Sequence, residues 1–104
     1  MSKAKYTIIT AEEAKNRIDT EQDIIILDVR TKEEFNESHI PSAVNIPLDV
    51  VTDKVDKIYS KNTKIFIYCR SGVRSKYASS YLAEMGFTNI FEFGGIITWP
   101  YEKV

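Results

Sequence analysis

Cysteine and histidine are scarce in this sequence, which has one of each, Cys69 and His39, among 104 residues. A lone cysteine can form neither a disulfide within the chain nor a Cys-x-x-Cys redox pair. One cysteine and one histidine also supply too few ligands for a zinc site, so we expect no metal and no other cofactor. The cysteine usage therefore gives no sign of an oxidising compartment.

An excess of charge and a long apolar run are also missing. The formal net charge is -1 at pH 7, which gives no reason to expect a nucleic acid or an acidic membrane as a partner. No apolar run approaches the roughly 20 residues of a membrane-spanning helix, and the run near the N-terminus is too short for a signal peptide. We therefore expect a cytoplasmic protein in which any cationic site is local.

The chain does contain enough apolar material for a core. Hydrophobic residues make up 43% of it and charged residues 28%, as is ordinary for a globular protein. A chain of this length buries roughly two thirds of the surface that it exposes when unfolded. We expect residues 1–104 to form a single domain with one core.

Extended and helical patterns alternate along the chain. Strands are expected at 6–9, 24–27, 44–46, 64–68 and 89–93, helices at 11–18, 32–37, 48–59 and 73–85, and a helical turn at 96–99. Thr10 and Thr31 each begin a Thr-x-x-Glu capping box, and the unbroken apolar run at 24–27 is typical of a central parallel strand. The alternation predicts an α/β fold with a mostly parallel sheet and helices on both faces.

Two finer expectations concern the C-terminal third. In the helix at 73–85, which should stop at Gly86, the spacing predicts a buried face of Ala78, Tyr81, Leu82 and Met85. The Gly94-Gly95 pair reads as a turn after the last strand.

The stretch from Thr63 to Gly86 carries the chemistry. A strand rich in β-branched and aromatic residues delivers Cys69, and a short loop, 70–73, leads directly into a helix. Loops beyond the carboxyl ends of parallel strands collect at one edge of the sheet. We therefore expect the segments 28–30 and 48–49 to lie near Cys69.

Three features of this stretch favour a thiolate. Backbone N–H groups of the loop can curl into an anion-binding nest, and the following helix presents its positive end. Arg70 and Arg74 add fixed charges, and cationic surroundings lower the pKa of a thiol from about 8.5. We expect Cys69 to be the nucleophile, largely ionised at neutral pH. The residues expected to bind an anionic substrate are Arg70, Ser71, Gly72, Val73, Arg74 and Ser75.

Each candidate has a structural alternative. A lone cysteine at a strand end is often a small buried hydrophobe, and the arginines can be solvated surface charges. No general base is evident, because His39 lies in a His-Ile-Pro turn where a structural hydrogen bond is expected. Asp28 and Arg30 are expected to cap and fix loops, with a supporting role at the site as the alternative.

Four ordered segments of the chain resemble the rhodanese homology domain. They are I-I-L-D-V-R-T-K-E-E-F (25–35), S-H-I-P-S-A-V-N-I-P (38–47), I-Y-C-R-S-G-V-R-S (67–75) and F-G-G-I-I-T-W (93–99). The resemblance implies a three-layer α/β/α fold with a five-stranded central sheet. Ser38 and Ser42 stand where the family often has glycine, and there is no second cysteine to resolve a persulfide.

The resemblance also implies a sulfurtransferase. The Cys69 thiolate would take a sulfane sulfur from a small anionic donor such as thiosulfate, and cyanide or a thiol would remove it from the resulting persulfide. A sulfur-accepting partner protein is a further expectation, whereas a nucleic acid or membrane partner is not expected.

Two other classes of function stay open. A phosphatase or arsenate reductase shares the cysteine-loop-arginine plan, but its loop has five residues between cysteine and arginine, whereas four separate Cys69 from Arg74 here. The shorter loop makes a smaller cradle, better matched to one sulfur atom than to a phosphoryl group. The third class is a sulfur carrier or a partner-binding regulatory module.

Overall fold

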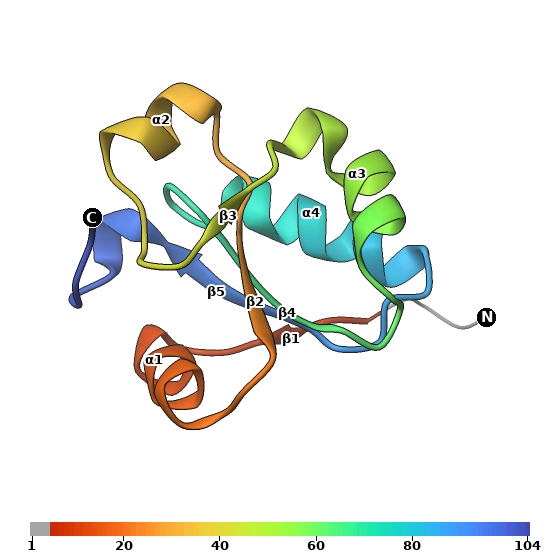
Figure 1. The fold of residues 1–104 in the computed structure, drawn as a ribbon, viewed down its shortest axis with the longest axis horizontal. Helices are drawn as coiled ribbons and strands as arrows, with labels where there is room; N and C mark the ends of the chain where they lie inside the picture. Colours follow the sequence, from red (N-terminus) through yellow and green to blue (C-terminus); the bar gives the residue numbers. More distant parts are fainter. Residues whose placement is uncertain (1–4) are drawn as a thin grey trace.

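The computed structural model describes residues 5–104 as one parallel sheet with helices on both faces (Figure 1). The strands are β1 (Thr7–Ile8), β2 (Ile24–Asp28), β3 (Val44–Asn45), β4 (Lys64–Cys69) and β5 (Ile90–Gly95). The helices are α1 (Ala11–Thr20), α2 (Lys32–Glu37), α3 (Val51–Ile58) and α4 (Val73–Glu84), with 3-10 turns at Leu48–Val50 and Ile96–Thr98. The expected α/β class and the five-stranded sheet are confirmed.

The strand order in the sheet is β1-β5-β4-β2-β3, and every neighbouring pair is parallel. Strands β4 and β2 therefore lie inside the sheet, as the unbroken apolar run at 24–27 predicts. Because all strands point the same way, their carboxyl ends share one edge. Cys69 ends β4 at this edge, and Asp28, whose register partner is Tyr68, ends the neighbouring strand β2 there.

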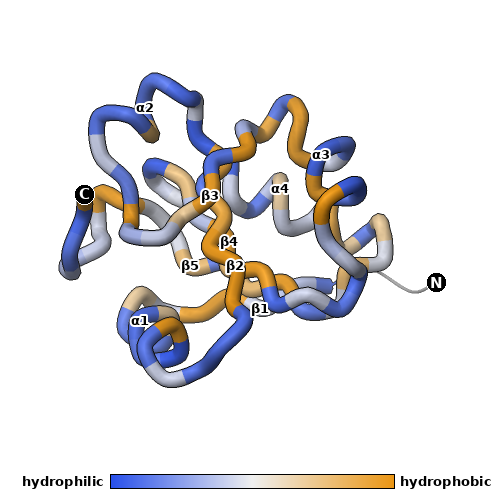
Figure 2. Tube along the Cα trace, viewed as in Figure 1, coloured by the Kyte–Doolittle hydropathy of each residue, from blue (hydrophilic) through white to orange (hydrophobic). Residues whose placement is uncertain are grey.

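Strand β4 divides the core into two layers. Its odd-numbered residues, Ile65, Ile67 and Cys69, pack with side chains of α3 and α4. Its even-numbered residues, Phe66 and Tyr68, pack with side chains of α1 and of the C-terminal segment. Apolar residues concentrate in the strands between these layers, as Figure 2 shows. The alternation turns the thiol toward α4.

Helix boundaries match the cap signals with small differences. Thr31 and Glu34 form the expected capping box at the start of α2. At α1, Thr10 accepts a hydrogen bond from the Glu13 N–H, and the helix continues to Thr20. The predicted helix 48–59 begins as a 3-10 turn and becomes α-helical only at Val51.

Two expectations from the C-terminal third are wrong. Gly94 and Gly95 belong to β5 and form no turn, because Gly95 pairs with Cys69 in the sheet. The side chain of Tyr81 is exposed, although the spacing placed it on the buried face of α4. Small residues allow α4 to lie close to the sheet, and its buried residues are Ser75, Ala78, Ser79, Leu82 and Ala83.

None of the helices formed by residues 5–104 is both long and apolar enough to cross a membrane. The same residues contain no group of three or more cysteine, histidine, aspartate or glutamate side chains placed to hold a metal ion.

Candidate active site

The sulfur of Cys69 lies inside the curl of the loop that joins β4 to α4. The residue is buried, and the N–H of Gly72 donates to Sγ across 3.0 Å. Gly72 is the N-cap of α4 and has φ 104°, a left-handed conformation that glycine adopts without strain. This conformation turns the chain sharply enough to direct its N–H back at the sulfur.

The start of α4 has no side-chain cap. The first N–H groups of a helix have no partner within the helix, and they attract anions. Side chains of Arg70, Ser71 and Val73 are exposed around this helix start. Ser71 and Val73 also line an open surface groove of about 560 Å³ together with Lys76 and Tyr77. The loop therefore offers an anion access to backbone donors from the solvent side.

Ser75 lies on the inner side of the sulfur. Its hydroxyl oxygen is 3.4 Å from Cys69 Sγ and 2.5 Å from Oε2 of Glu92. Glu92, on β5, is fully buried and also accepts a hydrogen bond of 2.9 Å from the N–H of Gly94. The arrangement is a buried row of thiol, hydroxyl and carboxylate.

Glu92 is the residue of this row that sequence reasoning missed. Its signal was a charged residue inside the apolar strand pattern at 89–93. A carboxylate at such a position is either exposed on the strand's other face or buried with partners. The sequence does not show which partners would meet it, because Ser75 is 17 positions away.

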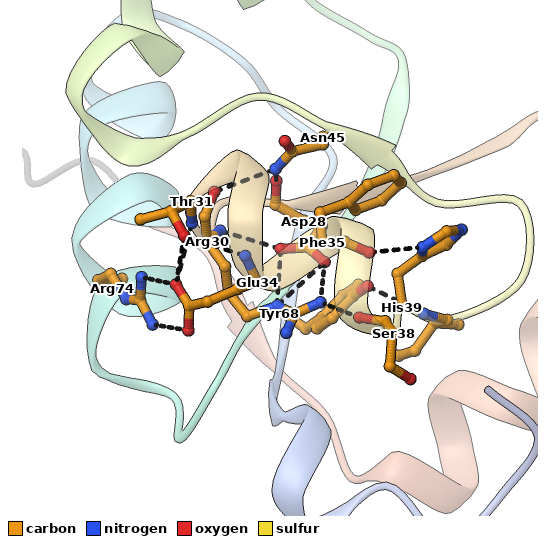
Figure 3. A network of polar contacts seen from close by, with 11 residues as sticks. Asp28, Arg30, Thr31, Glu34, Phe35, Ser38, His39, Asn45, Tyr68 and Arg74 are labelled. Carbon is orange, nitrogen blue, oxygen red and sulfur yellow. Dashed lines mark hydrogen bonds and ion pairs between the residues drawn. The ribbon is translucent and has the colours of Figure 1, made fainter. Parts of the chain in front are cut away.

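Arg74 does not point freely into solvent. Its guanidinium forms two hydrogen bonds to the carboxylate of Glu34, at 2.7 and 3.0 Å (Figure 3). These bonds, with those from the backbone and hydroxyl of Thr31, lower the pKa of Glu34 to about 2. Glu34 in turn raises the pKa of Arg74. Helix α2 is thus tied to the first turn of α4, a contact that the sequence pattern did not predict.

Asp28 and Arg30 form a buried pair at the end of β2. Arg30 donates to Asp28 at 2.7 Å through Nη2 and at 3.1 Å through Nε, and its Nη2 also donates to the carbonyl of Ser38 (Figure 3). The amide of Asn45 donates to the carbonyls of both residues. These contacts fix the loops after β2 and before β3 at the edge where Cys69 lies.

His39 has a structural role, as expected. Its Nδ1 lies 2.9 Å from the carbonyl oxygen of Phe35, and its ring stacks on the Phe35 ring with centroids 3.8 Å apart. The ring therefore belongs to the end of α2. The segment 48–49, in contrast, reaches the active-site edge, where Leu48 and Asp49 line a hollow together with Arg74.

This fold and this cysteine loop define a known class. The sequence profile of the rhodanese-like domain matches residues 10–99. The chain belongs to the rhodanese family.

Named relatives support the class of reaction. The chain is 34% identical to a sulfurtransferase of Allochromatium vinosum over 88% of its own length and 85% of the relative's. It is 35% identical to the thiosulfate sulfurtransferase PspE of Escherichia coli, over 75% and 76% of the two chains. These relatives support sulfurtransferase activity in general for this chain.

The fold comparison agrees. The crystal structure of a rhodanese-like domain protein from Staphylococcus aureus has a TM-score of 0.81 and 35% identity. The match covers 92% of this chain and 93% of that one. The resemblance that the four sequence segments indicate is therefore confirmed at the level of family and fold.

Proposed function

We propose that this chain moves a sulfane sulfur from a small anionic donor, such as thiosulfate, to cyanide or a thiol through a persulfide on Cys69. The observation that carries the proposal is the position of Sγ, which receives the Gly72 N–H at 3.0 Å inside a loop that opens onto an uncapped helix start. In this proposal residues 1–104 act as a single domain. The protein acts in the cytoplasm.

The reaction has two displacement steps. The Cys69 thiolate attacks the outer sulfur of thiosulfate, an S–S bond to Sγ forms, and the original S–S bond breaks as sulfite leaves with the electron pair. A cyanide or thiolate acceptor then attacks the outer sulfur, and the Cys69 thiolate leaves. Covalent catalysis of this kind gives ping-pong kinetics.

The loop residues have distinct proposed roles. The backbone from Arg70 to Arg74 holds the charge of the outer persulfide sulfur, because successive N–H groups form an anion nest. The exposed side chain of Arg70 attracts the donor, with Ser71 as a hydrogen-bond donor. Arg74 contributes less to attraction of the donor, since Glu34 neutralises much of its charge.

Asp28 and Arg30 have a supporting role at a distance from the chemistry. Their mutual pairing uses most of the hydrogen-bonding capacity of both side chains. They act by holding the sheet edge on which the loop rests. The four-residue spacing from Cys69 to Arg74 favours a sulfur atom over a phosphoryl group.

A sulfur carrier for a partner protein is the second candidate. The side chains of Val73 and Tyr77, 61% and 55% exposed, stand beside the cysteine loop. Exposed apolar side chains at the mouth of a site are a common feature of protein docking surfaces. A carrier of this kind would load from thiosulfate slowly and release its sulfur to a protein thiol.

Intact mass spectrometry after incubation with thiosulfate tests the proposal. The wild-type chain is expected to gain one sulfur atom, which cyanide removes, and Cys69→Ser is expected to gain none. His39→Asn serves as a matched control that leaves the loop intact and should load as the wild type does. No gain from thiosulfate or from an alkyl persulfide would refute sulfur transfer, and hydrolysis of an aryl phosphate would favour the phosphatase alternative.

A further inference from the structure

The carboxylate of Glu92 is a charged group buried directly behind the nucleophile. Its exposed fraction is 0%, and its neighbours on β5, Phe91 and Phe93, are apolar. Burying a carboxylate is costly unless hydrogen bonds and an opposite charge compensate it. Apolar packing therefore does not explain why a carboxylate is buried at position 92. The polar groups that contact Glu92 indicate its role.

Glu92 has three polar partners. Oε2 accepts hydrogen bonds from the Ser75 hydroxyl and from the Gly94 N–H, and Nζ of Lys76 lies 3.4 Å from Oε1. Among the described residues, Glu92 Oε1 and Ser79 Oγ are the buried side-chain polar atoms without a hydrogen-bond partner. The ammonium group of Lys76, which faces Glu92, is half-exposed, so solvent screens part of its charge.

The direction of the hydrogen bonds follows from the chemistry of the groups. An ionised carboxylate only accepts, so the single hydroxyl proton of Ser75 points at Glu92 across 2.5 Å. The Ser75 oxygen therefore presents a lone pair to Cys69 Sγ, 3.4 Å away. In this state the thiol donates its proton to Ser75, and a Cys69 thiolate would face a lone pair with a negative charge behind it.

We propose that Glu92 is a positioning residue that controls the proton of Cys69 through Ser75, whose hydroxyl is hydrogen-bonded to both side chains. When the thiol ionises, its S–H bond breaks and the proton binds to Ser75 Oγ. The previous Ser75 O–H bond breaks at the same time, and that proton binds to Glu92 Oε2. The pair keeps one negative charge, now on sulfur, as expected for groups that share a site.

This proton shift also changes the role of Ser75. Its hydroxyl, an acceptor toward the thiol, becomes a donor toward the thiolate and toward the persulfide that follows. A donor is what a sulfur anion in a buried site requires. Ser75 therefore donates to the sulfur only after Glu92 has taken a proton. The inference rests on the proposed function, in which Cys69 is the nucleophile.

Other charged groups surround the pair. On α4, Lys76 faces Glu92, and Arg74 acts on Cys69 but is neutralised by Glu34 of α2. Arg70 lies in the exposed loop, and the phenol of Tyr6 lines the groove with Lys76. Of these groups, Lys76 and Glu92 are in mutual contact. Their charges act on the thiol in opposite directions.

The test is the pH profile of Cys69 alkylation by iodoacetamide. Glu92→Gln keeps one side-chain oxygen that can accept from Ser75 and Gly94, as Oε2 does now, but removes the buried charge. It is expected to lower the midpoint of the profile by roughly one pH unit or more, because ionisation of the thiol then no longer requires a proton to be placed on a buried carboxylate. Lys76→Met removes the opposing cation and is expected to raise the midpoint. Glu84→Gln, an exposed acid at the far end of α4, is the control and should leave the midpoint unchanged.

Each possible midpoint shift supports or overturns the proposed role of Glu92. A Glu92→Gln midpoint that is unchanged or higher would overturn the proposal, since a purely structural carboxylate has no effect on the profile. If Glu92→Gln does not fold, an unchanged or lowered midpoint in Lys76→Met overturns it instead. Alkylation needs no sulfur donor, so a protein that never loads sulfur but shows these shifts separates this inference from the proposed function.

Discussion

At the scale of single residues, the loop around Cys69 depends on how closely two backbone segments approach each other. Gly95 pairs with Cys69 in the sheet, and a Cβ atom at position 95 would lie 2.0 Å from the carbonyl oxygen of Arg70. Such contacts to the backbone cannot be relieved by moving a flexible side chain. The loop can therefore curl around the sulfur only because position 95 has no side chain.

Replacing Gly95 by alanine is expected to displace the cysteine loop. The variant should lose sulfur loading from thiosulfate, measured by intact mass, and its Tm should fall. Gly94→Ala is the matched control, because a Cβ there meets nothing within 4 Å. The control suffers only the strain of a positive φ, about 1–2 kcal/mol, and should still load sulfur. Normal loading by Gly95→Ala would contradict this account.

At the scale of elements, the loop is held by ties between helices that are far apart in sequence. Glu34 of α2 binds Arg74 of α4, 40 positions away, and at the same time completes the capping box with Thr31. Glutamine can also serve in a capping box. Glu34→Gln therefore removes the charge of this tie while it preserves the start of α2.

The stability that this tie contributes should depend on acid. The folded pKa of Glu34 is about 2, below the value of about 4.3 for an unfolded glutamate. The contribution is therefore complete above about pH 5 and is lost as the pH falls from about 4.3 toward 2. Because both side chains are partly exposed, it amounts to no more than about 1 kcal/mol.

Thermal melts of wild type and Glu34→Gln across this pH range check the prediction. The difference in Tm should be largest near neutral pH and should close as the pH approaches 2. Glu33→Gln, the exposed neighbour in the same helical turn, should show no such dependence on Arg74. A Tm difference that widens in acid would show that the sign is wrong. Glu34→Gln should also lower the KM for thiosulfate severalfold, because the substitution frees the positive charge of Arg74.

At the scale of the whole molecule, the sheet joins two core layers, and the candidate active site lies at the edge of one of them. Cys69 belongs to the same buried cluster as Leu82 of α4 and Val55 of α3. The position of α4 against the sheet therefore sets the position of the helix start that faces the sulfur. Stability and site geometry are coupled through this layer.

Leu82→Ala tests the coupling. Removing a fully buried leucine is expected to cost about 2–5 kcal/mol in the free energy of unfolding. Tyr81→Ala, at the exposed neighbouring position, should cost less than about 1 kcal/mol. Denaturant unfolding measures both values. A similar loss in the two variants would mean that α4 is not anchored through the face that contains Leu82.

Local sequence signals account for the elements and for the position of Cys69 at the end of a strand. Apolar runs, capping residues and Gly72 act within a few positions of themselves, so strands, helix starts and the cysteine loop follow from the sequence. The close pairing of Gly95 with Cys69 did not follow from the sequence, because two consecutive glycines are also the usual signal of a turn. The exposure of Tyr81 was not predicted, because helical spacing indicates which side of a helix is buried but not how wide the buried face is.

Only the tertiary structure brings the partners of the loop together. Ser75 meets Glu92 across 17 positions and Arg74 meets Glu34 across 40. The parallel order of the strands decides both contacts, because it places β5 beside β4 and α2 beside the start of α4. The sequence alone predicts Cys69 and its loop as the candidate site. The carboxylates that meet Ser75 and Arg74 come from segments that only folding brings near.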